Sequence, residues 1–175
     1  ASLVLAVCLT AACGTSPRST PLLGTGPVLI FDIDTLRADH LGCYGYDRDT
    51  SPRIDALANE AYRFEWVFSQ APKTSLSQGS IFTGLYPSNH GLIGDDDHLS
   101  ESLTTLAEAF SAAGYRTAAF VSTYLLKPHA CGLDRGFDTY DHGMTAPNFG
   151  HAQFAVCVIV PHDGVEGCIA HGITV

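Results

Sequence analysis

The most constraining feature of the sequence is a continuous apolar run that leads directly into two acidic residues. Val28–Phe31 is apolar at every position and follows the turn-forming pair Gly26 and Pro27. A short run of this kind predicts a strand of a parallel sheet that is buried on both faces. Asp32 and Asp34 come at its carboxyl end, and in an extended chain both carboxylates point to the same side. Such a pair suits a hard cation, whereas acids that cap a neighbouring turn are the alternative.

Helical and strand patterns follow this run along the chain. Ser51 and Pro52 have the order of a helix cap and a first helical residue, and apolar positions then recur at helical spacing. A second helix is predicted over Ser102–Ala113, with Gly114 as its C-terminal stop. Thr117–Val121 reads as another short buried strand. The alternation of strands and helices predicts an α/β fold, a sheet with helices packed on its faces.

A hydroxyl-rich segment is the second candidate for chemistry. Lys73–Gly84 places Thr74, Ser75 and Ser77 where a helix is predicted to begin. A helix N-terminus offers free N–H groups and a positive dipole to an oxyanion, and a hydroxyl there can act as a nucleophile once its pKa is lowered. The alternative is that these hydroxyls only cap the helix, which is their commoner use.

Several blocks of the chain together resemble the N-terminal part of the sulfatase family, within the alkaline-phosphatase superfamily. They occur in the family's order between about residues 27 and 141. The blocks are Ile33-Asp34-Thr35-Leu36-Arg37-Ala38-Asp39-His40-Leu41-Gly42-Cys43-Tyr44-Gly45, Ser51-Pro52-Arg53-Ile54-Asp55-Ala56-Leu57-Ala58, Phe82-Thr83-Gly84-Leu85-Tyr86-Pro87, Ala113-Gly114-Tyr115-Arg116-Thr117-Ala118 and Gly132-Leu133-Asp134-Arg135-Gly136-Phe137-Asp138.

The resemblance implies a mixed sheet flanked by helices, a divalent metal and the hydrolysis of sulfate esters. Asp34 and Thr35 match the two adjacent metal-ligand positions of the family, and Asp32 has no counterpart there. Thr74 matches the catalytic nucleophile. The remaining site residues, expected to orient the oxyanion, are Ser75, Ser77 and Gln78. The expected metal is calcium in a sulfatase, and zinc or manganese in the relatives that use Thr.

The sequence also departs from the sulfatase pattern. Sulfatases convert a Cys or Ser within Cys/Ser-x-Pro-x-Arg to formylglycine, whereas this chain has Thr74 at that position and lacks both the Pro and the Arg. Ser122 and Tyr124 stand where sulfatases commonly place an active-site Lys and His. A phosphodiesterase or phosphotransferase with Thr74 as nucleophile is therefore an alternative. A non-catalytic surface lipoprotein with a sulfatase-like fold is another.

The ends of the chain carry different patterns. Residues 1–13 resemble a bacterial signal peptide that ends in a lipobox, with Cys13 as the lipidation site, and residues 14–27 resemble a flexible tether. Residues 28–143 form the sulfatase-like part, and residues 144–175 are a divergent tail without Lys or Arg. We therefore expect an exported, lipid-anchored protein of the bacterial cell envelope. We also expect the sulfatase-like domain, and with it the catalytic site, to be incomplete in this chain.

The charge balance limits the possible partners. With 9 Lys and Arg against 18 Asp and Glu, the 175-residue chain carries a formal net charge of −9. A nucleic-acid partner is not expected, because binding along phosphates needs a basic stripe. The only membrane contact expected is through the lipid anchor, since no apolar run has the length of a membrane span. The expected substrate is a small-molecule or glycan ester of sulfate or phosphate.

Overall fold

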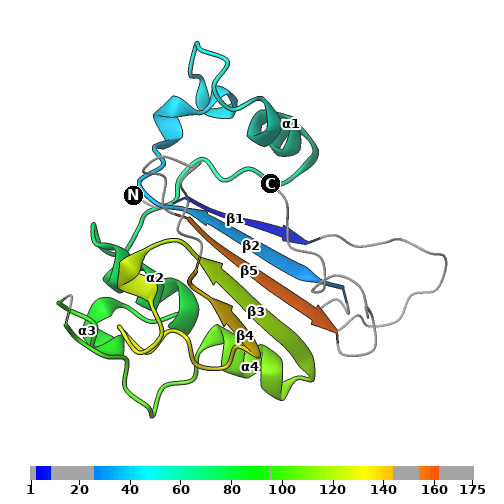
Figure 1. Cartoon of the computed structure of the whole chain (residues 1–175). Coiled ribbons are helices and arrows are strands. Elements are labelled where there is room, and N and C mark those ends of the chain that lie inside the picture. The colour runs from blue at the N-terminus through cyan, green and yellow to red at the C-terminus, as the bar shows by residue number, and fades with distance from the viewer. Residues whose placement is uncertain (1–2, 9–25, 95, 144–153, 162–175) are drawn as a thin grey trace.

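A five-stranded mixed sheet forms the centre of the molecule (Figure 1). The computed structural model describes residues 3–8, 26–94, 96–143 and 154–161. In spatial order the strands are β1 (Leu3–Cys8), β2 (Val28–Ile33), β5 (Phe154–Pro161), β3 (Tyr115–Val121) and β4 (Thr139–Asp141). The strands expected at residues 28–31 and 117–121 are thus present, and the sheet with its helices confirms the α/β class.

The expectation of parallel neighbours for the strand at Val28 is wrong. β2 pairs antiparallel with β1 on one side and with β5 on the other. β5 also pairs antiparallel with β3, so that β2 and β3 run in the same direction with β5 between them. An apolar run indicates that both faces of a strand are buried. It does not indicate whether the neighbouring strands run parallel or antiparallel to it. Because Asp32 and Val121 both pair with Ala155, the carboxyl ends of β2 and β3 lie level with each other.

The helices fall into two groups (Figure 1). On the β3–β4 side lie α2 (Thr74–Thr83), α3 (Pro87–His90), α4 (Leu106–Ala112) and the 3₁₀ turn η3 (Tyr124–Leu126). Beyond the β1–β2 side, α1 (Pro52–Glu60) forms a separate lobe with the 3₁₀ turns η1 (Ala38–His40) and η2 (Gly42–Tyr44). Among the described residues, no helix has the length and apolar character needed to cross a membrane.

Two helix boundaries test the sequence patterns directly. α1 begins at Pro52, as predicted from Ser51 and Pro52. α4 begins at Leu106 instead of Ser102, because the Thr105 hydroxyl accepts a hydrogen bond from the N–H of Glu108 while the Glu108 carboxylate accepts one from the N–H of Thr105. This reciprocal cap fixes the helix start. Leu103 lies before the helix and still packs against the core, so its apolar position extends the helical pattern of the sequence beyond the helix itself.

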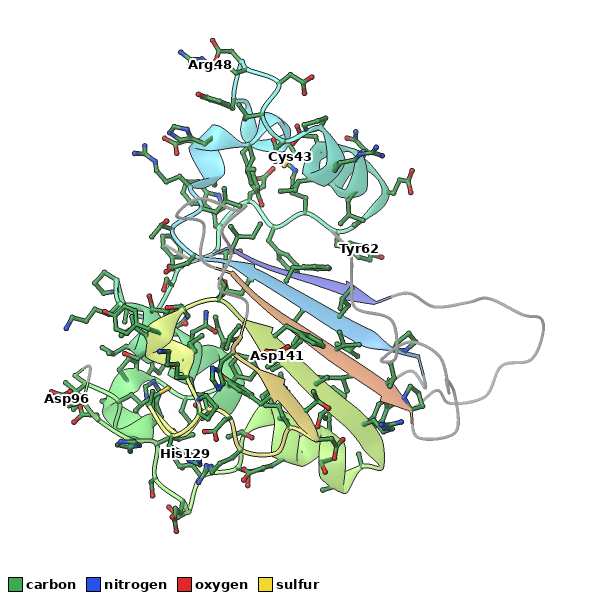
Figure 2. All side chains as sticks on the ribbon, viewed as in Figure 1. Cys43, Arg48, Tyr62, Asp96, His129 and Asp141 are labelled. Carbon is green, nitrogen blue, oxygen red and sulfur yellow. The ribbon has the colours of Figure 1, made fainter. Side chains whose placement is uncertain are left out.

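The lobe around α1 is held by one carboxylate. Asp55 accepts hydrogen bonds from the backbone N–H of Cys43 (2.7 Å) and from the hydroxyl of Ser51 (3.0 and 3.1 Å to its two oxygens). Ser51 in turn accepts a bond from the N–H of Gly42. A Cβ at Gly42 would lie 2.4 Å from Asp55 Oδ2, so the turn needs glycine there. Figure 2 shows Cys43 in this lobe beside α1. These family-like residues therefore have a structural role.

A second set of family-like residues joins β3 to the loop before β4. Thr117 donates its hydroxyl to the carbonyl of Gly136 (2.7 Å) and its N–H to Asp138 Oδ2 (2.8 Å). The N–H of Asp138 returns a bond to the carbonyl of Thr117. Arg135 donates to the carbonyl of Leu103 (2.7 Å), which ties the same loop to the segment before α4. The blocks at residues 113–118 and 132–138 therefore meet in space and stabilise the edge of the sheet.

One segment leaves large apolar side chains exposed. Between α1 and α2, Tyr62 is 95% and Trp66 is 80% exposed, and Phe64, Val67 and Phe68 are also largely exposed. Figure 2 shows Tyr62 pointing away from the ribbon in this connection. The buried core lies elsewhere, where residues of β2, α2, β3 and β5 pack together.

The close approach at Gly136 gives the first testable prediction. A Cβ at Gly136 would lie 2.3 Å from the backbone nitrogen of Glu108, and its φ of +85° also disfavours other residues. Gly136→Ala should lower the free energy of unfolding by about 3 kcal/mol or more, since conformational strain and overpacking add. Gly114→Ala is the matched control, because its φ is +83° and nothing lies within 4 Å. That change should cost only about 1–2 kcal/mol. Equal losses for the two variants in urea unfolding would contradict the account.

Candidate functional site

The end of β2 and the first two turns of α2 contact each other through two pairs of polar side chains. Thr74 Oγ1 donates a hydrogen bond to Asp34 Oδ2 at 3.2 Å. Gln78 Nε2 donates to Asp32 Oδ2. Thr74 and Gln78 are four residues apart and share one face of α2, while Asp32 and Asp34 are two apart at the strand end. The strand thus presents its two carboxylates to a matching pair of side chains on the helix.

The first turn of α2 has no side-chain cap at its N-cap position. Its N-cap residue, Lys73, makes no capping hydrogen bond with its side chain, and the first intrahelical bond runs from the N–H of Ser77 to the carbonyl of Lys73. The N–H groups of the first turn consequently have no acceptor within the helix. The Thr74 hydroxyl bonds to Asp34. The N-capping alternative for these hydroxyls is therefore not observed, and the helix end keeps its capacity to bind an anion.

The other predicted site residues occupy different environments. Ser75 is buried, and its hydroxyl has no hydrogen-bond partner. Ser77 is also buried, but its hydroxyl lies 2.9 Å from that of Ser69 and joins the preceding loop to α2. Thr35 is exposed in the turn after β2, with a φ of 58°. The structure therefore brings Asp34, Thr74 and Gln78 together with Asp32, while the Ser77 hydroxyl bonds to Ser69 and Thr35 is exposed in the adjoining turn.

Burial perturbs the electrostatics of Asp32. The residue is 5% exposed, and burial together with the neighbouring charge of Asp34 raises its pKa from 3.8 to about 6. Asp32 Oδ1 and Gln78 Oε1 are buried without hydrogen-bond partners. Unpartnered buried oxygens are uncommon in folded proteins and call for a ligand, an ordered water or a cation. Carboxylate, amide and hydroxyl oxygens are the donors that hard divalent cations take, so the residues fit such an ion.

A buried histidine, which the sequence did not single out, holds α2 in place. The N–H of Leu92 donates to His90 Nδ1 at 3.1 Å, so the ring proton lies on Nε2 and is donated to the Ser80 hydroxyl, also at 3.1 Å. The Ser80 hydroxyl in turn donates a hydrogen bond to the carbonyl of Leu76. Burial lowers the pKa of His90 and favours this neutral form. A Cβ at Gly79 would meet His90 and Leu92, so glycine allows the close contact between α2 and α3.

The raised pKa of Asp32 gives a testable dependence of stability on pH. An acid whose pKa is higher in the folded state stabilises the fold at low pH, and this contribution is lost as the pH rises through about 6. We therefore compare the free energy of unfolding of Asp32→Asn with that of the original protein at each pH. The difference should shift in favour of Asp32→Asn between pH 4.5 and pH 7.5. Urea unfolding with a chelator present measures it. The exposed Asp96, which lies at the periphery in Figure 2, supplies the control Asp96→Asn. A constant difference at both pH values would contradict the assignment.

Several proteins named as sulfatases are similar to part of this chain. The arylsulfatase of Clostridium perfringens is 35% identical over 91 residues, which are 51% of this chain and 19% of that protein. The ulvan-active sulfatase of Formosa agariphila is 35% identical over 95 residues, 54% of this chain and 19% of that protein. The N-acetylgalactosamine-6-O-sulfatase of Bacteroides thetaiotaomicron is 26% identical over 139 residues, 77% of this chain and 26% of that protein.

The chain thus spans about a fifth to a quarter of the length of these relatives. No solved structure matches it. The family model described as Sulfatase matches residues 28–149, which begin with β2 and include α2 and the contact between them. On this match, the protein belongs to the sulfatase family.

Proposed function

We propose that this chain carries the nucleophile-bearing part of a sulfate-ester hydrolase, with Thr74 as the nucleophile. The observation that carries the proposal is the hydrogen bond from Thr74 Oγ1 to Asp34 Oδ2 at the N-terminus of α2. A hydroxyl becomes a nucleophile when a neighbouring group accepts its proton, and Asp34 is placed to do so. Membership of the sulfatase family supports the sulfate ester as substrate class.

The proposed reaction has two steps. Thr74 Oγ1 attacks the sulfur atom of the ester while its proton moves to Asp34, and the bond between sulfur and the ester oxygen breaks. The leaving alcohol takes up the proton, and the sulfo group stays on Thr74 until water releases it as sulfate. We propose that the N–H groups of the first turn of α2, with the hydroxyl of Ser75, stabilise the negative charge that develops on the sulfo oxygens.

The sulfatase family generally uses a divalent metal, and the donor set at this site fits one. Asp34 and Thr74 would hold it, and when bound it would lower the pKa of the attacking hydroxyl. Thr35, expected as a second ligand from the family pattern, is exposed in the turn. Calcium is the ion proposed for a sulfatase, and zinc or manganese for a phosphate-transferring relative.

A phosphodiesterase or phosphotransferase is the second candidate. The observation in its favour is Thr74 itself, an unmodified hydroxyl where sulfatases carry the Cys or Ser that becomes formylglycine. The same contact with Asp34 would serve attack on phosphorus. For either chemistry the proposed substrate is a small-molecule or glycan ester, in keeping with relatives named as an arylsulfatase and an ulvan-active sulfatase.

Substitution of Thr74 tests the proposal. With calcium, zinc or manganese present, Thr74→Ala should lower kcat for an aryl sulfate by about 10³-fold or more, because the attacking atom is removed. Thr74→Ser keeps the hydroxyl and should retain part of the activity. Ser88→Ala is the control, since it removes a hydroxyl that is exposed and hydrogen-bonded only to Asn89 outside the site. The assay uses the full-length protein.

The outcomes separate the candidates. Preferential hydrolysis of the aryl sulfate supports a sulfatase, whereas preferential hydrolysis of a bis-aryl phosphate supports the second candidate. Full activity of Thr74→Ala would remove Thr74 as the nucleophile. Absence of activity towards both esters would favour a non-catalytic lipoprotein that keeps the fold.

We also propose that the protein is exported and anchored to a membrane of the bacterial envelope by a lipid on Cys13. The support is the run of small residues before Cys13, which lies outside the described residues. In a bacterial host the protein should partition into the membrane fraction, and Cys13→Ser should abolish the lipid-dependent mass increase measured by mass spectrometry. An unmodified protein that is released without the signal segment would contradict the proposal.

A further inference from the structure

We propose that Asp32 supplies the second carboxylate of the divalent-cation site and that Gln78 positions it. This inference rests on the divalent metal of the proposed function, and it assigns a ligand that the family pattern does not contain. Asp32 comes from within β2, two residues before Asp34, instead of from the position after Asp34. The ligand is Asp32 Oδ1, because Oδ2 accepts the hydrogen bond from Gln78 Nε2.

Unpartnered buried atoms indicate where a cation belongs. In the part of the chain that the structure describes, four buried side-chain atoms have no hydrogen-bond partner: Asp32 Oδ1, Ser75 Oγ, Gln78 Oε1 and Arg135 Nε. Two of the oxygens, Asp32 Oδ1 and Gln78 Oε1, belong to the hydrogen-bonded pair that joins β2 to α2. Ser75 Oγ lies in the first turn of α2, and the nitrogen belongs to the loop near α4. A cation satisfies oxygens in this situation, since each can offer it a lone pair.

The burial of the two side chains supports a built site. Asp32 is 5% exposed and Gln78 is 1% exposed. A buried carboxylate without a compensating charge is costly, and a bound divalent cation supplies that charge. Each carboxylate contacts α2, Asp34 through Thr74 and Asp32 through Gln78, and these two helix residues are one turn apart. Together the two carboxylates match the ion's charge of +2.

Alternative donors at this place are few. Thr35, which follows Asp34, is exposed and has a left-handed backbone conformation. Within the described ranges, no group of three or more His, Cys, Asp or Glu side chains is placed to hold a metal. The described donors at the strand end are therefore two carboxylates with hydroxyl and amide oxygens around them, a set that suits calcium or manganese.

The role of Gln78 follows from its hydrogen bond. Its amide N–H fixes one oxygen of Asp32 and leaves the other for the ion. Partners of this kind orient a ligand, and their loss commonly costs about 10- to 100-fold in metal affinity. Gln78 is therefore a positioning residue, and its effect should appear in the dissociation constant of the metal.

Metal binding measured by calorimetry tests the inference without any assay of activity. Calcium chloride and manganese chloride are titrated separately into the metal-free protein at pH 7.5. Asp32→Asn should raise Kd at least tenfold, as Asp34→Asn should, because each removes one of two charged ligands. Gln78→Met should raise Kd about tenfold. Asp96→Asn removes an exposed charge and should leave Kd unchanged.

Circular dichroism checks that each variant is folded. If Asp32→Asn does not fold, Asp32→Ser removes the same carboxylate with a smaller side chain and should show the same loss of affinity. A Kd for the folded Asp32 variant within twofold of the original, or no binding of either metal by the original protein, would overturn the inference. Loss of affinity in the Asp32 variant together with full activity of Thr74→Ala would retain the inference and reject the proposed function.

Discussion

The contact between the end of β2 and the first two turns of α2 is the constraint on which the rest of the structure depends. It pairs Asp34 with Thr74 and Asp32 with Gln78. The strand alone would expose its acids to water, and the helix alone would offer a hydroxyl with no group to accept its proton. Brought together, they place a hydroxyl, a carboxylate and the first-turn N–H groups of the helix in one location, and the proposed attack on a sulfate or phosphate ester rests on this arrangement.

Much of the described chain outside this contact stabilises other parts of the fold. The chain of bonds through His90 and Ser80 fixes α2 against α3. The bonds of Thr117 to the loop at Gly136 fix the edge of the sheet. Asp55 closes the lobe that follows β2. A sequence match in these blocks is therefore evidence for the fold, whereas the proposed chemistry rests on the few residues at the end of β2 and the start of α2.

Local patterns predicted a large part of the fold from sequence. The strand at residues 28–33, the helix that begins at Pro52 and the helix that begins with the hydroxyl cluster all form. Non-local pairing was not predictable. β5 lies in the tail, where the family resemblance ends, and its antiparallel insertion beside β2 depends on partners more than a hundred residues apart. The start of α4 was misplaced because Leu103 keeps the helical spacing while it packs from a loop. Asp34 and Thr74 were expected from the resemblance, and they lie in contact. The hydrogen bond between Asp32 and Gln78 was not predictable, because it joins residues that are distant in the sequence.

The most direct measurement of the central claim is the identification of the residue that becomes covalently modified during turnover. The protein is mixed with an aryl sulfate or a bis-aryl phosphate, quenched with acid within the first turnover, digested and analysed by mass spectrometry. The account predicts a sulfo or phosphoryl group on Thr74. A modified Ser75 or Ser77, or product formation with no modified residue in this segment, would contradict it.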